Sequence, residues 1–347
     1  MAIRVGFTEQ HSGEYEGNPY KQVRHYLTLV AKFDKVSEQI WRIEELPKLP
    51  IGLASFGAAA LGDHIYVFGG HSGRAHQYHE GNVHGALYRL NWRRPQQWER
   101  LGDAEPGQGL AFLAARDKLY RIGGMRALNR QEEEANLVSL STFTAYDVRN
   151  EKWEPLPQLP ESRSSCDAAL VGSRIYVFGG WKLGPGGRTW YDYGLVFDLE
   201  KPQQGWQRLP QPFRRRALAV VAWKEQIYVL GGLRADGKLS LEVDIFDPLG
   251  NSWRKGPELP GPVQNGFSPA VCVHNGALYL SPGDGKLYRY QNNRWQLVGS
   301  VPPFRVSHRL ISLPDGRLCV LGGSPRAPKR NAAEDMLSLV QAIRLTR

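Results

Sequence analysis

Sulfur-containing residues and long apolar runs are scarce in this sequence, whose 347 residues include three cysteines and three methionines. No stretch approaches the roughly 18 consecutive apolar residues of a membrane-spanning helix, so no membrane span is predicted. Cys166, Cys272 and Cys319 form no CxxC pair, which argues against zinc-knuckle and thioredoxin-type sites. All three lie in or beside apolar runs, and three buried thiols favour a reducing compartment, with one disulfide as the alternative.

A leader sequence is also lacking from the first 30 residues, which show no charged start followed by an apolar stretch and a cleavage site. The expected location is therefore cytoplasmic. A periplasmic or secreted protein is the alternative, if an export signal precedes these residues.

The short motifs of several enzyme classes are missing: there is no phosphate-binding glycine loop, nucleophile elbow or HExxH motif. The formal net charge is +10, but the basic residues are spread over the whole chain without a nucleic-acid recognition motif. We therefore expect no cofactor and no nucleic-acid partner. The basic balance suits an anionic small ligand, an acidic peptide or a charged surface.

The sequence contains instead one short motif in six copies, an apolar run that ends in a tight glycine turn. The first copy is Ile65-Tyr66-Val67-Phe68-Gly69-Gly70. The first residues of the six turns are Gly69, Gly123, Gly179, Gly231, Pro282 and Gly322. Their spacings of 54, 56, 52, 51 and 40 residues indicate a strand-built repeat of the propeller type.

The rest of each repeat is a strand ending in an aromatic or large apolar residue, a hairpin turn and a return strand. Tyr146-Asp147 and Phe246-Asp247 are clear examples of the end of the strand that follows the glycine turn. A tryptophan follows each within a few residues, at Trp98, Trp153, Trp206, Trp253 and Trp295. Leu-Pro turns such as Leu259-Pro260 and a further apolar strand complete a four-stranded unit.

This arrangement resembles the kelch family of β-propellers, and the similarity covers nearly the whole chain. The resemblance implies an all-β fold: a six-bladed propeller with four-stranded antiparallel blades. Glycine supplies the positive φ that the turn needs, and tryptophan covers the gap between neighbouring blades. Because both recur in every blade, we expect them to serve packing rather than function.

The repeat leaves no room for a domain boundary, so we predict one monomeric propeller over residues 23–347 after an N-terminal extension over residues 1–22. N- and C-terminal strands are expected to close the ring within one blade. Trp41, after Phe33-Asp34, would end a blade that Gly322-Gly323 opens. Leu337 to Leu345 also resemble a third strand, so this blade has an extra strand or one terminal segment packs outside it.

Function is expected on one face of the ring. In a four-stranded meander, the connections after the second and the fourth strand emerge on the same face, and here they are the longest and least repetitive segments. The longer ones are residues 71–85, 125–139, 181–193, 233–239 and 324–335. Binding residues commonly lie on such loops, held by a rigid scaffold.

The clearest chemical signal lies just before the first strands. Three blades place an arginine 16 or 17 residues before the glycine turn, at Arg163, Arg214 and Arg305, with Arg215, Arg216, His308 and Arg309 adjoining. Since first strands line the channel, these groups could converge at its mouth as a cationic pocket for a carboxylate or phosphate. Alternatively, each arginine bridges blades or binds loop carbonyls.

Two other loops hold further candidate residues. Residues 181–193 contain aromatic and basic side chains suited to sugar faces or peptides, unless they pack onto the blade. These are Trp181, Arg188, Trp190, Tyr191 and Tyr193. The acidic run Glu132, Glu133 and Glu134 could supply a base, although consecutive glutamates are more typical of a solvated surface.

A metal site is a weaker hypothesis. His71, His76, His79 and His84 share one loop, but their spacing has no register that fixes ligand geometry. The copper site of galactose oxidase, a related propeller, needs two Tyr, two His and a Cys beside one Tyr, a set that cannot be mapped onto this sequence.

Two functions follow. The first, and preferred, is a kelch-repeat interaction protein whose loop face binds an anionic partner, a protein or peptide with acidic groups. The second is a carbohydrate-active enzyme, since the chain resembles the bacterial kelch-propeller N-acetylneuraminate epimerase, which interconverts the anomers of sialic acid. In that case an arginine would hold the carboxylate of this anionic sugar, and Glu132, Glu134 or His308 would move the proton.

Overall fold

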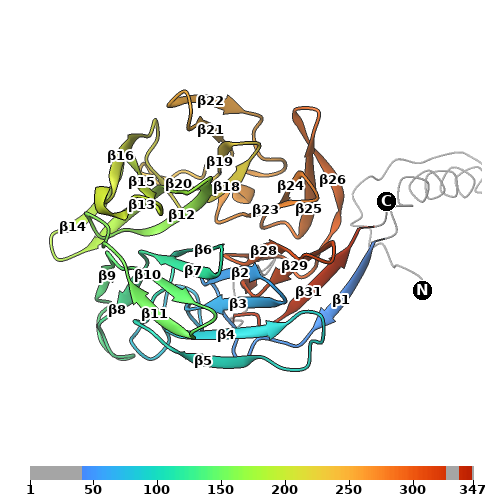
Figure 1. Ribbon diagram of the computed structural model, residues 1–347, viewed down its shortest axis with the longest axis horizontal. Coiled ribbons are helices and arrows are strands. Elements are labelled where there is room, and N and C mark those ends of the chain that lie inside the picture. The colour runs from blue at the N-terminus through green and yellow to red at the C-terminus, as the bar shows by residue number, and fades with distance from the viewer. Residues whose placement is uncertain (1–40, 326–335, 346–347) are drawn as a thin grey trace, which may run out of the picture. The chain divides into compact units, whose positions relative to one another are not determined.

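The strands of the protein form six four-stranded antiparallel blades around a centre (Figure 1). The computed structural model describes residues 41–325 and 336–345, and Arg42–Arg344 make up one compact unit. The first strands of successive blades contact one another in a closed ring, with β2 of blade 1 touching both β6 of blade 2 and β28 of blade 6. The predicted all-β, six-bladed propeller is confirmed.

Blades 1 to 3 follow one another along the chain. Blade 1 consists of β2 (Gly57–Leu61), β3 (His64–Phe68), β4 (Ala86–Asn91) and β5 (Glu99–Asp103). Blade 2 consists of β6 (Ala111–Ala115), β7 (Lys118–Ile122), β10 (Phe143–Asp147) and β11 (Lys152–Pro155). Blade 3 consists of β12 (Ser164–Val171), β13 (Arg174–Gly184), β15 (Tyr193–Asp198) and β16 (Gln207–Pro210), with β14 (Gly187–Trp190) paired to β13.

Blades 4 to 6 complete the ring. Blade 4 consists of β18 (Ala219–Trp223), β19 (Gln226–Leu230), β21 (Val243–Asp247) and β22 (Ser252–Gly256). Blade 5 consists of β23 (Ala270–His274), β24 (Ala277–Ser281), β25 (Lys286–Gln291) and β26 (Arg294–Ser300). Blade 6 consists of β28 (Arg309–Ser312), β29 (Arg317–Leu321), β31 (Val340–Arg344) and β1 (Arg42–Leu46).

Short elements occupy the loops of the predicted functional face. They are β8 (Met125–Ala127) with β9 (Leu137–Ser139), β17 (Arg215–Arg216) with β20 (Leu233–Arg234), and β27 (Arg305–Val306) with β30 (Ser324–Pro325). Two 3-10 turns, η1 (Pro202–Gln204) and η2 (Val263–Gly266), interrupt other connections. Across residues 41–325 and 336–345, the chain forms no helix with the length and apolarity needed to cross a membrane.

Both ends of the chain contribute to blade 6, as predicted. β31 occupies the third position of the blade and β1 the fourth, with Leu46 opposite Val340. Trp41 directly precedes β1, as Trp98 precedes β5 in blade 1 and Trp206 precedes β16 in blade 3. Among the described residues blade 6 therefore has four strands, and the C-terminal strand β31 lies nearer the centre of the ring than the N-terminal strand β1. Phe33-Asp34 and the proposed boundary between residues 22 and 23 lie outside the described residues.

The repeat tryptophans join neighbouring blades, as predicted. The indole Nε1 of Trp206 in blade 3 donates to the Pro157 carbonyl of blade 2 at 2.9 Å. Trp253 of blade 4 donates in the same way to the Pro210 carbonyl of blade 3 at 2.9 Å. The Leu-Pro turns therefore act as acceptors for the indole of the next blade, and the same rings fill the apolar layer between blades.

The glycine turns bring neighbouring blades into close contact. Gly69 has a φ of +67°, and a Cβ at this position would lie 2.4 Å from the Gly107 carbonyl oxygen of the segment that leads into blade 2. Any other residue would push the two blades apart. In blade 5, Pro282 replaces the first glycine, and only four residues separate β24 from β25.

A closed circle of six backbone hydrogen bonds joins the segments that lead into the first strands. One residue from each blade has a left-handed φ between +46° and +58°, and its N–H donates to the carbonyl of the equivalent residue in a neighbouring blade at 2.7 to 3.4 Å. The six are Ser55, Gly109, Ser165, Ala217, Ser268 and Ser307. We call them the backbone ring. It holds all six segments at one level, so that the side chains beside it have fixed positions.

Candidate functional site

A central cavity of about 740 Å³ opens beside the backbone ring, and all six members of the ring line it. Its wall also includes loop residues of blades 1, 2 and 3, among them Tyr78, Leu137 and Trp181. Blade 5, with its four-residue loop, contributes only the segment Phe267, Ser268 and Pro269. The cavity therefore lies on the predicted functional face, and among the described residues blades 1 to 3 contribute more of its wall than blade 5 does.

The charged groups of the central cavity have one sign. Arg188, Arg216 and Arg309 line it, and no aspartate or glutamate is present among its described lining residues. A concave surface with cations and without carboxylates attracts anions, and the low-dielectric wall strengthens that attraction. Of the arginines that the sequence analysis named, Arg188, Arg216 and Arg309 line the cavity, whereas Arg163, Arg214 and Arg305 do not.

Arg216 is the least compensated of these cations. Its guanidinium carbon lies 4.1 Å from the ring centroid of Trp181, a cation–π contact, and its Nε is buried without a hydrogen-bond partner. None of the described carboxylates approaches its nitrogens within ion-pair distance. Burial lowers the pKa of Arg216, and the nearby Arg188 lowers it further. A guanidinium desolvated without an anion is the arrangement expected of a binding group.

Arg309 differs because its guanidinium is already bonded across the ring. From blade 6 its Nε donates to the Phe56 carbonyl of blade 1 at 2.6 Å and its Nη2 to the Leu110 carbonyl of blade 2 at 3.2 Å. Its Nη1 lies 3.9 Å from Asp167 of blade 3, a carboxyl whose pKa burial raises. Arg309 thus ties three blades to its own.

Several polar groups in the wall of the central cavity are buried and have no hydrogen-bond partner among the described residues. They are both ring nitrogens of His71, Nε2 of Gln108, Nε1 of Trp181 and Nδ1 of His308. Burial lowers the pKa of His71 to about 4 and that of His308 to about 3, so both imidazoles are neutral at pH 7. Buried polar groups normally find partners, and a group of them around one cavity is typical of a binding site.

Arg163 and Arg305, which the sequence placed at the channel mouth, do not line this cavity. Arg163 is fully buried, its Nη1 donates to the carbonyls of Gly179 (2.9 Å) and Tyr193 (3.1 Å), and its guanidinium lies over the Tyr191 ring. Arg305 donates to the carbonyls of Pro302 and Gly322. The expected convergence is corrected here: these arginines bind carbonyls within their own blades, which is the alternative that the sequence left open.

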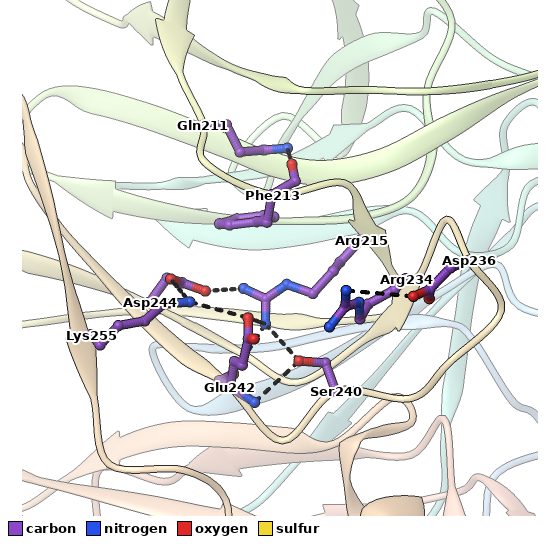
Figure 2. Close-up of polar contacts among 9 residues, drawn as sticks. All are labelled: Gln211, Phe213, Arg215, Arg234, Asp236, Ser240, Glu242, Asp244 and Lys255. Carbon is purple, nitrogen blue, oxygen red and sulfur yellow. Dashed lines mark hydrogen bonds and ion pairs between the residues drawn. The ribbon is translucent and has the colours of Figure 1, made fainter.

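In blade 4 the equivalent arginine is Arg215, not Arg214. Its guanidinium bonds to Asp244, to Ser240 Oγ at 3.3 Å and to the Glu242 carbonyl at 3.1 Å, as Figure 2 shows. Arg214 is exposed and pairs with Asp192 at 2.5 Å. Three consecutive arginines therefore have three environments, which an alignment on the glycine turn could not distinguish.

A second hollow of about 690 Å³ lies beside Arg215, between blades 3 and 4. It is lined by charged side chains of both signs. The cations are Arg214, Arg215, Arg234 and Lys255, and the anions are Asp192, Asp236 and Glu242. Most are already paired, such as Arg234 with Asp236 at 3.4 Å (Figure 2). Because its charges compensate one another, we regard the central cavity as the candidate functional site.

The remaining predicted site residues are divided between the cavity and the blades. Trp181, Arg188, Arg309 and His308 line the cavity, and Trp190 packs against Trp181 with ring centroids 5.2 Å apart. Tyr191 is buried, and its hydroxyl donates to the Ser162 carbonyl at 2.8 Å. Glu132 and Glu134 are exposed on the β8–β9 loop and do not line the cavity. Of the proposed proton-transfer groups only His308 is in place, and its lowered pKa makes it a weak base at neutral pH.

The four loop histidines have separate environments. His71 is buried and His76 exposed, and both line the cavity. His84 shares a hydrogen bond of 2.8 Å with Ser72 Oγ, and His79 Nδ1 accepts one from the Gly81 N–H. In the part of the chain that the structure describes, no three His, Cys, Asp or Glu side chains gather as metal ligands. The three cysteines are buried and free.

Comparison with known proteins decides the family. The profile of the KLHDC2/KLHL20/DRC7 Kelch-repeats domain matches residues 55–285, well over half of the chain. The chain belongs to the kelch-repeat family. A solved structure of the same architecture, titled "Structure of YjhT", superposes with a TM-score of 0.67 and covers 85% of this chain and 96% of its own at 15% identity. At that identity the likeness concerns the fold alone.

Curated relatives of this kelch propeller include two larger proteins. Human Kelch repeat and BTB domain-containing protein 12 is 25% identical over 268 residues, which are 74% of this chain and 41% of that protein. Mouse Kelch-like protein 35 is 28% identical over 241 residues, which are 69% of this chain and 36% of that protein. The chain thus spans less than half the length of either relative. Kelch-repeat proteins generally mediate protein interactions.

Proposed function

We propose that this kelch propeller is a protein-interaction module that receives an acidic segment of its partner in the central cavity. The observation that carries this proposal is the charge of the lining: Arg188, Arg216 and Arg309 line the cavity, and none of its described lining residues is an aspartate or a glutamate. An acidic side chain entering the cavity would meet the guanidinium of Arg216, which burial has already partly desolvated. Charge-assisted hydrogen bonds to such a group are stronger than those formed in water.

The scaffold supports this role because the cavity is largely preformed. The backbone ring fixes the six segments around it, and Met125, Trp181 and Leu183 pack into an apolar cluster in its wall. A preformed site loses little conformational entropy when it binds, which favours recognition of a short, flexible segment. The family's general role in protein interactions agrees with this use of the loop face.

The proposal is tested by selecting binders from a phage-displayed library of random peptides on the immobilised protein. We expect the selected sequences to be enriched in aspartate and glutamate. Their affinity, measured by fluorescence polarisation, should fall by more than about 30-fold in the double variant Arg188→Ala/Arg216→Ala, because two charge-assisted contacts are lost. It should also weaken as salt is raised from about 50 to 300 mM, since part of the attraction is screened.

Arg294→Ala is the matched control. Arg294 is an exposed arginine at the start of β26, and its removal changes the net charge without touching the cavity. We expect the control to keep wild-type affinity within about twofold. Selection of peptides without acidic residues, or unchanged affinity in the double variant, would refute the proposed function.

A further inference from the structure

Two arginines of the central cavity share one aromatic ring. The guanidinium carbon of Arg216 lies 4.1 Å from the Trp181 centroid and that of Arg188 lies 5.5 Å from the same centroid. The two distances limit the separation of the guanidinium groups to at most 9.6 Å (4.1 Å plus 5.5 Å). Two positive charges are thus held close together, an arrangement that costs free energy unless anions are present.

The indole that the two arginines share is fixed in place. Trp181 belongs to β13, lies opposite Trp190 of β14 in the strand register, and is only 8% exposed. Ser139 Oγ accepts a hydrogen bond at 2.9 Å from the N–H of Leu183, two residues further along β13. An arginine stacked on a rigid ring keeps its planar fork in one orientation, which favours bidentate recognition of a planar anion.

No anion of the described protein compensates this pair. Neither Arg188 nor Arg216 takes part in an ion pair or a side-chain hydrogen bond among the described residues, whereas Arg309 already has two carbonyl partners. The two cations also differ in depth, because Arg216 is partly buried and Arg188 is exposed. The oxygens of a phosphate surround one phosphorus atom, so a phosphate would occupy one depth in the cavity. Two carboxylates joined by a chain can reach both the deeper Arg216 and the shallower Arg188.

We propose that the Trp181-bridged arginines bind two carboxylates at once, one deep at Arg216 and one shallow at Arg188, so that the ligand is a dicarboxylate. This inference rests on the proposed function if the carboxylates are acidic side chains of a partner. In an extended peptide, side chains at positions i and i+2 lie on one face about 6.5 to 7 Å apart, a spacing within the reach of this pair. A free small diacid has the same chemistry, and the experiment separates the two sources.

The test uses the whole protein and 19F NMR of trifluoroacetate, a carboxylate probe whose line broadens on binding. Acetate, malonate, succinate, glutarate, adipate and inorganic phosphate are then added as competitors at constant ionic strength. We expect the best dicarboxylate to compete at least about tenfold better than acetate and better than phosphate, because its second carboxylate binds without a second loss of translational freedom.

Single variants assign the two positions. Arg188→Ala should keep acetate competition and lose the dicarboxylate advantage, whereas Arg216→Ala should weaken both acetate and dicarboxylates by about tenfold or more. Arg294→Ala is again the control and should behave as the wild type. Circular dichroism and the melting temperature of each variant establish that its fold is intact. Because Arg188 is exposed, we expect its substitution to leave the fold unchanged.

Three results would overturn the inference: no broadening of the probe, equal competition by acetate and every dicarboxylate, or stronger competition by phosphate. The outcome is separable from that of the proposed function. Dicarboxylate binding without selection of acidic peptides would keep the paired site and identify its ligand as a free diacid. Acidic peptides that bind while dicarboxylates show no advantage over acetate would keep the proposed function and remove the paired site.

Discussion

Arg215 and Arg216 are consecutive residues of β17, yet their guanidinium groups have opposite environments. Arg215 is 1% exposed and is bonded to Asp244, Ser240 and the Glu242 carbonyl (Figure 2). Arg216 lies against Trp181 in the central cavity without an ion-pair partner among the described residues. Since consecutive strand residues point in opposite directions, one arginine serves its blade and the other faces the cavity.

The difference separates two uses of the same side chain. A buried cation such as Arg215 has all of its partners within the fold and stabilises the fold only together with them. Its removal leaves a buried carboxylate with less counter-charge. A cation without internal partners contributes little to folding and is available to a ligand. Stability measurements should therefore respond to Arg215, and binding measurements to Arg216.

The largest expected effect comes from Arg215→Met. The substitution leaves Asp244, which is 2% exposed, with Lys255 as its remaining cation at 2.8 Å. We expect the free energy of unfolding to fall by about 3 kcal/mol, at the low end of the range for a broken buried pair because Lys255 stays. Urea unfolding followed by tryptophan fluorescence measures the change.

Arg216→Met is the matched partner of that variant. It should change the free energy of unfolding by no more than about 1 kcal/mol, because the lost cation–π contact is offset by removal of a desolvated charge. Equal destabilisation by Arg215→Met and Arg216→Met would refute the distinction between an arginine that stabilises the fold and one that is available to a ligand. Adding Asp244→Leu to Arg215→Met should recover part of the loss, since both buried charges are then gone.

The fold was largely predictable because the repeat is a packing pattern. The turn at Gly69 needs a positive φ and close contact with the next blade, and Trp206 must reach the Pro157 carbonyl of its neighbour. Such demands recur in each blade and so become visible in the sequence. The order of the terminal strands in blade 6 was also visible, since residues 337–345 resembled a third strand and Trp41 the end of a blade, and β31 does lie between β29 and β1.

The site was less predictable, because it depends on single residues that break the repeat. Trp181, Arg188, Arg309 and His308 were identified as loop-face candidates and do line the cavity. Gln108 was missed, and Arg216 was seen only as a neighbour of Arg214. Arg216 directly precedes Ala217, which has a left-handed φ, and an alanine carries no sequence signal for that conformation. Serines at four positions of the backbone ring are a signal that could have marked these segments.

The buried histidines should make the free energy of unfolding depend on pH, because a histidine can be neutral near pH 7 whereas an arginine stays charged. His71 and His308 are held neutral in the fold, with pKa values of about 4 and about 3 against 6.5 in the unfolded chain. The unfolded state therefore binds more protons below pH 6.5, and the free energy of unfolding should fall as the pH is lowered from about 6.5 towards 4. For each histidine the loss should be on the order of 3 kcal/mol by pH 4.

Urea unfolding at a series of pH values measures this slope. His71→Phe and His308→Phe should each flatten it between pH 6.5 and about 4, because the variant has one fewer group to protonate on unfolding. A slope that both substitutions leave unchanged would mean that carboxylates, rather than these imidazoles, determine the acid sensitivity.

The smallest effect compares two indoles, one with a partner and one without. Trp98 Nε1 donates to the Pro47 carbonyl of blade 6 at 2.8 Å, whereas Trp181 Nε1 is buried and has no partner in the part of the chain that the structure describes. Changing either residue to phenylalanine keeps an aromatic ring and removes one indole N–H. We expect Trp98→Phe to lower the free energy of unfolding by about 1 kcal/mol more than Trp181→Phe does, the net value of one hydrogen bond. Paired urea titrations resolve this difference, and a larger loss for Trp181→Phe would show that its indole N–H supports the fold rather than facing a ligand site.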